Sequence, residues 1–147
     1  MLPGRGRYAA ANNKSVELTY GLAGLFLSSF LAATLLPGGS EVVLAVVLAN
    51  GTASMWPALA AATLGNTLGG STSYLIGRLL PQRKLSGRAL EWVRHWGAPV
   101  LLLSWVPIIG DALCVAAGWL KLNIGWVLLF MAVGKFARYY VIARVLT

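Results

Sequence analysis

The sequence predicts an all-α integral membrane protein with two re-entrant helical hairpins that face each other and two spanning helices. Of its 147 residues, 58% are hydrophobic and only 11% are charged, whereas about a quarter of an average soluble domain is charged. Twice, inside apolar sequence, a proline is followed four residues later by a carboxylate, at Pro37 with Glu41 and at Pro107 with Asp111. Proline breaks a helix, and a carboxylate in hydrocarbon is costly. Their repetition indicates broken helices that meet at a polar site.

The amino-terminal part of the chain predicts a polar tail followed by the first hairpin. Residues 1–17 carry Arg5, Arg7 and Lys14 and are expected to form a loose aqueous tail, before a single membrane domain over residues 18–147. Residues 18–36 are apolar and uncharged, and residues 42–49 form a second apolar run. A helix of eight residues rises about 12 Å, too little for a hydrocarbon core of about 30 Å. The two runs therefore predict a re-entrant hairpin over residues 18–49.

The tip of this hairpin is predicted at residues 37–41, where Pro37, Gly38 and Gly39 precede the acid.

The next apolar segment, residues 55–80, is long enough to span. It carries small residues at four-residue spacing, namely Gly65, Gly69, Ser73 and Gly77. Such a stripe lets another helix approach closely, so it predicts a packing face, either within the chain or between copies. The polar side chain of Asn66, beside the stripe, is expected to face the protein interior.

Residues 81–97 read as a basic linker that contains an amphipathic helix. Leu85, Ala89, Trp92 and Trp96 recur at helical spacing, with polar residues on another face. This pattern is typical of a helix that lies in the membrane interface. Because the linker is short and basic, we place it on the cytoplasmic side and both chain ends on the other.

The carboxyl-terminal part repeats the plan. Residues 98–120 predict a second hairpin whose tip holds Pro107, Gly110 and Asp111, and residues 126–146 predict a second span. That span contains Lys135 and Arg138, three residues apart and so on one helix face. One span between two hairpins makes their tips approach from opposite leaflets. The order therefore predicts an inverted repeat with its site near the bilayer midplane.

Four charges lie in apolar sequence: Glu41, Asp111, Lys135 and Arg138. They allow two interpretations. In the first, they form a purely structural ion-pair lock. In the second, Lys135 and Arg138 hold a phosphate headgroup together with the helix ends at the hairpin tips. Glu41 or Asp111 then binds and releases a proton, because apolar surroundings disfavour a charged carboxyl group.

Composition and motifs exclude several other functions. The net charge of +8 is interpreted as membrane orientation and attraction to anionic headgroups, since no nucleic-acid-binding motif is present. The sequence contains no catalytic triad, P-loop, zinc-ligand spacing or dinucleotide-binding turn. We therefore expect no enzyme activity, no cofactor and no metal. The expected partners are membrane lipids, a polyprenyl phosphate among them, and protons. Assembly of two or more copies is one option.

Several motifs resemble those of the DedA superfamily, also called the VTT or SNARE-associated Golgi protein superfamily, and in particular its small YqaA-like branch. They are SSFLAATLLPGGSE at residues 28–41, GNTLGG at 65–70, LLSWVP at 102–107, GD at 110–111, GW at 118–119 and GKFARY at 134–139. The resemblance covers roughly residues 18–142. It implies an inner membrane protein with two facing re-entrant loops, and a role in moving undecaprenyl phosphate, phospholipid or a proton-coupled solute.

The chain departs from the usual pattern of this family at two places. Typical members carry arginines three residues before and three residues after the second-loop proline, where this chain has Ser104 and Gly110. The acid that usually precedes the first-loop proline is replaced by Ala33, whereas Glu41 is retained. We hypothesise that Lys135 and Arg138 stand in for the missing loop arginines.

Overall fold

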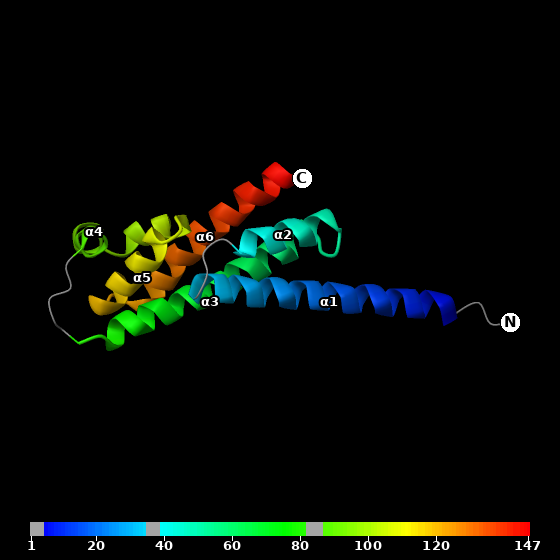
Figure 1. Ribbon diagram of the computed structural model, residues 1–147, viewed down its shortest axis with the longest axis horizontal. Helices are drawn as coiled ribbons and strands as arrows, with labels where there is room; N and C mark the ends of the chain where they lie inside the picture. Colours follow the sequence, from blue (N-terminus) through cyan, green and yellow to red (C-terminus); the bar gives the residue numbers. More distant parts are fainter. Residues whose placement is uncertain (1–4, 35–38, 82–86) are drawn as a thin grey trace.

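The computed structural model describes residues 5–34, 39–81 and 87–147, which form an elongated helical bundle (Figure 1). In chain order, the helices of these ranges are α1 (Arg5–Thr34), α2 (Gly39–Ala49), α3 (Met55–Leu79), α4 (Arg88–Trp96), the 3₁₀ helix η1 (Ala98–Trp105), α5 (Ile109–Trp119) and α6 (Ile124–Leu146). All regular structure in the described ranges is helical, which confirms the predicted all-α class.

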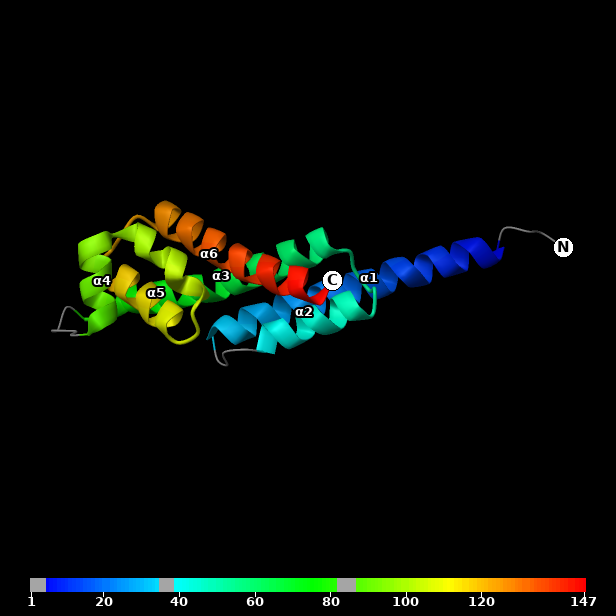
Figure 2. The ribbon, with the colours of Figure 1, turned by 90° about the horizontal axis from the view of Figure 1, so that it is seen from above.

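The prediction of a loose amino-terminal tail is wrong from Arg5 onward. Helix α1 begins at Arg5 and continues without a break into the apolar segment. Its polar part extends beyond the other helices (Figures 1 and 2), and the side chains of residues 10–20 are exposed. Local hydrogen bonds support it: Asn13 Nδ2 donates to Glu17 Oε1 at 3.0 Å, and Thr19 Oγ1 donates to the Ser15 carbonyl at 2.8 Å. Extending an existing helix fixes few additional dihedral angles for each new hydrogen bond, so the stable apolar part propagates helix into the tail.

Within the described residues, two helices are long and apolar enough to cross a membrane, residues 10–33 of α1 and the whole of α6. The second agrees with the predicted span, whereas the first had been assigned to a hairpin arm. Helix α3, predicted as the other span, is not among them. Its 25 residues reach about 37 Å, but the glycine, serine, threonine and asparagine residues that face its neighbours make it less apolar.

The chain folds back on itself twice. Helix α2 returns along α1, and α5 returns along η1, so that the first turns of α2 and α5 lie toward the middle of the molecule (Figures 1 and 2). Glu41 lies in the first turn of α2, and Asp111 lies in the first turn of α5. The amino-terminal end of a helix carries a partial positive charge, which makes both positions favourable for a carboxylate.

The second hairpin has a tight connection between its arms. Its first arm is a 3₁₀ helix rather than the usual α-helix; 3₁₀ winding rises about 2.0 Å per residue and gives a longer arm for the same chain. A Cβ atom on Gly110 would overlap the carbonyl oxygen of Ser104, so only glycine allows this approach. At the tip, Ile109 N donates to the Pro107 carbonyl at 2.7 Å around Ile108, whose φ is 68°. This γ-turn is strained, most of all for a β-branched residue.

Helix α3 lies at the centre of the bundle and uses the predicted stripe of small residues within the chain. A Cβ atom on Gly65 would overlap the Phe26 carbonyl of α1, and one on Gly77 would overlap the Val115 carbonyl of α5. The stripe therefore serves two different helices of the same chain. The idea that it forms a contact between copies is wrong, because α1 and α5 already cover it.

Two apolar clusters form the core, one at each hairpin. The first lies among α1, α2 and the adjoining parts of α3 and α6, and includes Leu25, Leu44, Leu59 and Ala143. The second lies among η1, α4, α5 and the other parts of α3 and α6, and includes Leu101, Leu113, Cys114 and Met131. Along α6, the buried Lys135 falls between the residues of the two clusters. The polar groups are thus concentrated where the two hairpins meet.

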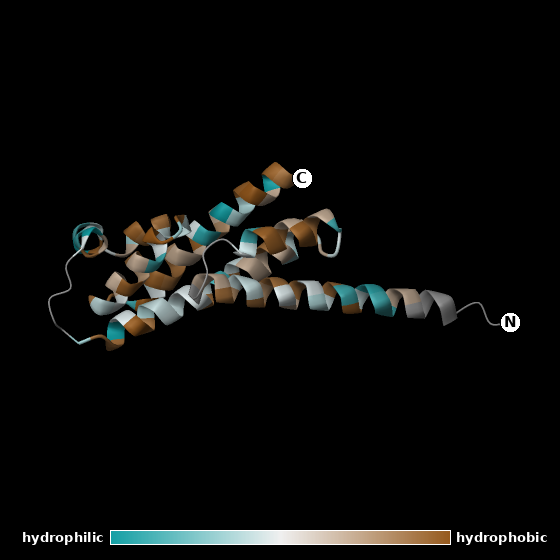
Figure 3. Cartoon of the chain, in the orientation of Figure 1, coloured by the Kyte–Doolittle hydropathy of each residue, from teal (hydrophilic) through white to brown (hydrophobic). Residues whose placement is uncertain are grey.

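Apolar residues recur along the helices (Figure 3), and many of the large apolar side chains are exposed. On α3, Leu64 is 58% exposed, and on α6, Leu129 is 51% exposed. Soluble proteins rarely expose apolar surface on this scale, so these outward faces suit contact with lipid chains.

Candidate functional site

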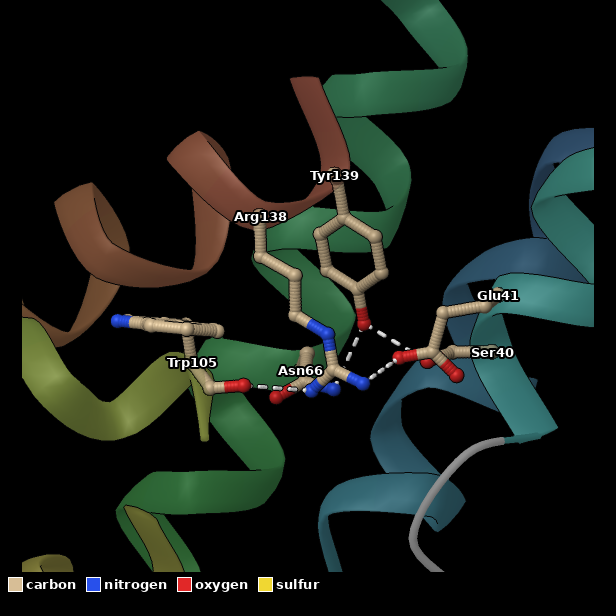
Figure 4. Close-up of polar contacts among 6 residues, drawn as sticks. All are labelled: Ser40, Glu41, Asn66, Trp105, Arg138 and Tyr139. Carbon is tan, nitrogen blue, oxygen red and sulfur yellow. Dashed lines mark hydrogen bonds and ion pairs between the residues drawn. The ribbon is translucent and has the colours of Figure 1, made fainter. Parts of the chain in front are cut away.

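Arg138 of α6 connects both hairpins (Figure 4). Its Nη2 forms an ion pair with Glu41 Oε1 of α2, and its Nη1 donates to the Trp105 carbonyl of η1 at 2.8 Å. The Arg138 and Glu41 side chains are 22% and 20% exposed. The carbonyl groups at the end of a helix lack partners within that helix and carry a partial negative charge. The guanidinium therefore lies between a carboxylate and the negative end of η1.

A second set of polar contacts centres on Tyr139, the next residue of α6. The buried Tyr139 hydroxyl lies 2.8 Å from Ser40 Oγ of α2, and Asn66 Nδ2 of α3 donates to it at 2.8 Å. Three helices are thereby joined at one phenolic oxygen (Figure 4). The expectation that Asn66 faces the interior is met.

Lys135 occupies a different place from Arg138, although both were predicted on one face. The Lys135 side chain is only 4% exposed, and its Nζ donates to the backbone carbonyl of Asn66 at 2.6 Å. Its charge interacts with that of Asp111, yet among the described residues no ion pair within 4 Å joins the two. The half-buried Asp111 carboxylate is therefore left without a close cationic partner.

Of the four embedded charges, Glu41 and Arg138 form a close ion pair in the described part of the chain. The two carboxylates therefore differ in their surroundings. Glu41 is held by Arg138, whereas Asp111 is not held by a cation in the described part of the chain. Lys135 and Arg138 contact different groups and do not converge on one vacant position. A phosphate group would therefore meet Arg138 rather than both cations at once.

Of the predicted tip residues, Pro37 and Gly38 lie outside the described residues. Gly39 begins α2, and no atom lies within 4 Å of the position that its Cβ would take. Pro107 lies at a cavity of about 440 Å³ beside Arg138, which is otherwise lined by Trp105, Ala137, Val141 and Ile142. A cation with an adjoining apolar cavity can accept an anionic head and part of an apolar chain.

Sequence reasoning missed three participants in this arrangement: Ser40, the Tyr139 hydroxyl and the Trp105 carbonyl. Ser40 and Tyr139 lie next to Glu41 and Arg138 in the sequence, so their proximity to charged residues in apolar segments was an available signal. A backbone carbonyl is present at every residue, and only the fold selects that of Trp105.

Replacing Tyr139 by phenylalanine is expected to lower the free energy of unfolding by about 1–3 kcal/mol, because Ser40 and Asn66 each lose a buried partner. The measurement is denaturant-induced unfolding of the purified protein in mild detergent. Tyr140→Phe is the matched control, since the hydroxyl of Tyr140 has no hydrogen-bond partner among the described residues. An equal effect of both substitutions would contradict the role given to the Tyr139 hydroxyl.

The chain is similar to proteins of bacterial inner membranes. It is 48% identical over 125 residues to the inner membrane protein YqaA of Escherichia coli strain K12, which covers 83% of this chain and 88% of the relative. YqaA of Shigella flexneri gives the same values. An uncharacterized protein of Haemophilus influenzae is 42% identical over 126 residues, 78% of this chain and 80% of the relative. No family model and no solved structure matches the chain.

Proposed function

Because this chain belongs to the YqaA-like branch of the DedA family of inner membrane proteins, we propose that it is a small transporter or scramblase-like protein. Its proposed cargo is a phosphorylated lipid, a polyprenyl phosphate or a phospholipid, or else a solute whose movement is coupled to protons. The proposal assigns no chemical reaction to the chain and requires no cofactor.

The observation that carries this proposal is the position of Arg138 beside an apolar cavity. The guanidinium supplies paired N–H donors that suit a phosphate, and the cavity of about 440 Å³ continues from it along Ala137 and Val141. A lipid phosphate has the same two parts, an anionic head and an apolar chain. Since the cavity lies on α6 next to outward-facing residues, a lipid would reach it from the bilayer.

The proposed membrane arrangement is an inverted repeat with two re-entrant hairpins. Helices α2 and α5 have 11 residues each, about 16 Å, which is too short to cross. Each long central helix contacts the first arm of its own hairpin and the second arm of the other, α3 with α1 and α5, and α6 with η1 and α2. This reciprocal packing supports two related halves around a site near the midplane.

In the proposed cycle, a lipid phosphate replaces Glu41 as the partner of Arg138. Glu41 would then lose its counter-charge and take up a proton, and the hairpin tips, no longer joined through Arg138, would separate. Asp111 is the second proposed proton-binding group, because none of the cations in the described ranges forms an ion pair with it. Lys135 contributes positive charge nearby while its contact with the Asn66 carbonyl keeps α6 against α3.

A non-transporting structural or assembly factor for the envelope is the second candidate. The ion pair between Arg138 and Glu41 favours it, because the two groups already satisfy each other. In that case the pair only holds the hairpins together, and the cavity has no cargo.

The two candidates are separated by filling the cavity without changing a charge. We expect Val141→Trp to slow the movement of a fluorescent polyprenyl phosphate across reconstituted vesicles by about tenfold, equivalent to ~1.4 kcal/mol. Val145→Trp is the matched control, since Val145 lies one helical turn further along α6, is 80% exposed and is not among the residues that line the cavity. If the wild-type protein moves neither polyprenyl phosphate nor phospholipid, a lipid is not the cargo. If proton uptake driven by a pH gradient is absent from the same vesicles as well, the transport proposal fails and the structural one stands.

Asp111→Asn tests the proposed coupling to protons. Because Asp111 has no close ion-pair partner among the described residues, the variant should fold with nearly wild-type stability. It should lose the acceleration that a pH gradient gives to lipid movement in the same vesicles. Glu91→Gln, which removes an exposed acid from α4, should leave that acceleration intact. Unchanged dependence on the gradient in Asp111→Asn would remove Asp111 from the proposed mechanism.

A further inference from the structure

Helix α4 lies across one end of the bundle rather than along it (Figures 1 and 2). The buried Leu90 and Val93 face the bundle, whereas Trp92 and Trp96 are 40% and 66% exposed. An amphipathic helix is thus present over Arg88–Trp96, whereas Leu85 of the predicted pattern lies outside the described residues. The exposed tryptophan side chains are available to the membrane interface, where this residue is enriched.

This end of the molecule is basic. The described cations near α4 and the neighbouring helix ends are Arg78, Arg88, Arg94 and Lys121, and the described acid there is Glu91. The opposite end, with Arg5, Arg7, Lys14 and Arg144 against Glu17, is basic too. Some of the cations at the α4 end are engaged by neighbours: Arg78 donates to the Tyr74 hydroxyl, and Arg94 lies over the Trp119 ring. An excess of cations beside interfacial tryptophan suits a leaflet that contains anionic lipid.

Arg88, at the start of α4, lies between two apolar hollows. One, of about 240 Å³, is lined by Arg88 together with Trp92, Ile108 and Ile109. The other, of about 370 Å³, is lined by Arg88 together with Val115 and Trp119. Ala89 and Ala112 border both hollows. Arg88 is exposed, and within the described part of the chain its guanidinium has neither an ion-pair partner nor a hydrogen-bond acceptor.

We propose that Arg88 and these two hollows form a binding site for a two-chain anionic phospholipid of the leaflet that α4 faces. The phosphate contacts the Arg88 guanidinium, and one acyl chain enters each hollow. A single cation between two apolar hollows matches a molecule with one anionic head and two tails. This site is separate from the cavity at Arg138, which is bordered by different residues.

The site also contacts the strained tip of the second hairpin. Ile108 and Ile109 line the smaller hollow, and the preceding Pro107 lines the cavity at Arg138. Ile108 is 73% exposed and adopts the positive φ of the γ-turn. An acyl chain in the smaller hollow covers this side chain, so a bound phospholipid supports the tip at residues other than the one that borders the Arg138 cavity.

The test is to count retained lipid by native mass spectrometry and to measure its affinity in detergent, with phosphatidylglycerol as the probe. We expect one tightly retained molecule on the wild type, and about fivefold weaker binding to Arg88→Gln, from the loss of one cation at the headgroup. Lys121→Gln is the matched control, because it removes one positive charge from the same end and lines neither hollow. It should bind as the wild type does.

Two further probes complete the experiment. Zwitterionic phosphatidylcholine and single-chain lysophosphatidylglycerol should both bind more weakly than phosphatidylglycerol. The first has no net charge, and the second lacks one acyl chain. Ala112→Phe, which fills the space between the hollows without altering a charge, should also weaken binding. Equal losses in Arg88→Gln and Lys121→Gln would overturn the proposal in favour of general attraction to a basic surface. Equal binding of phosphatidylcholine would overturn it as well.

Discussion

Replacing Arg138 by glutamine is expected to lower the free energy of unfolding by about 3 kcal/mol, the lower end of the cost of breaking a buried ion pair. The lower end applies because about a fifth of each side chain is exposed. The substitution leaves the Glu41 carboxylate without its partner and the Trp105 carbonyl without its donor. It therefore removes one polar contact between α6 and each hairpin in one step. Denaturant-induced unfolding in mild detergent gives the measurement.

A double-mutant cycle with Glu41→Gln tests the pair itself. The single change at Glu41 should cost less, because Arg138 keeps the Trp105 carbonyl and can still donate to a glutamine side chain. The double variant should cost little more than Arg138→Gln alone, since no unpaired carboxylate remains. Arg144→Gln and Glu17→Gln change the same charges at exposed positions and should have little effect. Strict additivity of the two single effects would show that the residues act independently.

Replacing Gly118 by alanine is expected to destabilise the protein by about 1–3 kcal/mol, the usual cost of forcing extra atoms into a filled core. A Cβ atom at Gly118 would overlap the Tyr74 carbonyl of α3, and one at Gly77 would overlap the Val115 carbonyl of α5. The two helices therefore touch backbone to backbone, and one added methyl group must push them apart. Because α5 carries Asp111, the displacement also moves that carboxylate relative to Lys135.

The predicted loss of stability in Gly118→Ala is opposite in sign to the effect that intrinsic helix preference would have. In a free helix, glycine to alanine is favourable by about 1 kcal/mol. Gly24→Ala is the matched control, because Gly24 is exposed in α1 and no atom lies within 4 Å of its Cβ position. That variant should be as stable as the wild type or more stable. If Gly118→Ala also gains stability, the close approach of α3 and α5 is not what requires glycine.

The alternation of apolar segments and breakers determined the plan of the chain. Helix breaking at Pro107 and the shortness of the apolar run after Glu41 predicted that the chain turns back, and α5 and α2 are the short returning arms. The same reasoning failed for residues 5–17, because a polar composition does not prevent an adjoining stable helix from propagating. It also wrongly predicted α3, rather than α1, as a spanning helix. Helix α3 is long enough to cross, but its glycine and hydroxyl-bearing residues lower its mean hydropathy.

Residue types and their spacing were enough to predict the all-α class, the two acids in the first turns of the returning helices, and Arg138, Lys135 and Asn66 as polar groups inside apolar helices. These features follow from local rules: helix periodicity, the effect of proline, and the cost of charge in hydrocarbon. The pairing of the charges, in contrast, depends on the packing of the helices. Helical spacing places Lys135 and Arg138 on one face, but their long side chains reach different neighbours, Lys135 the Asn66 carbonyl and Arg138 both Glu41 and the Trp105 carbonyl. Which neighbour each of these side chains contacts depends on the position of the two hairpins along α6. Backbone contacts at glycines set that position, and residue types alone do not predict it.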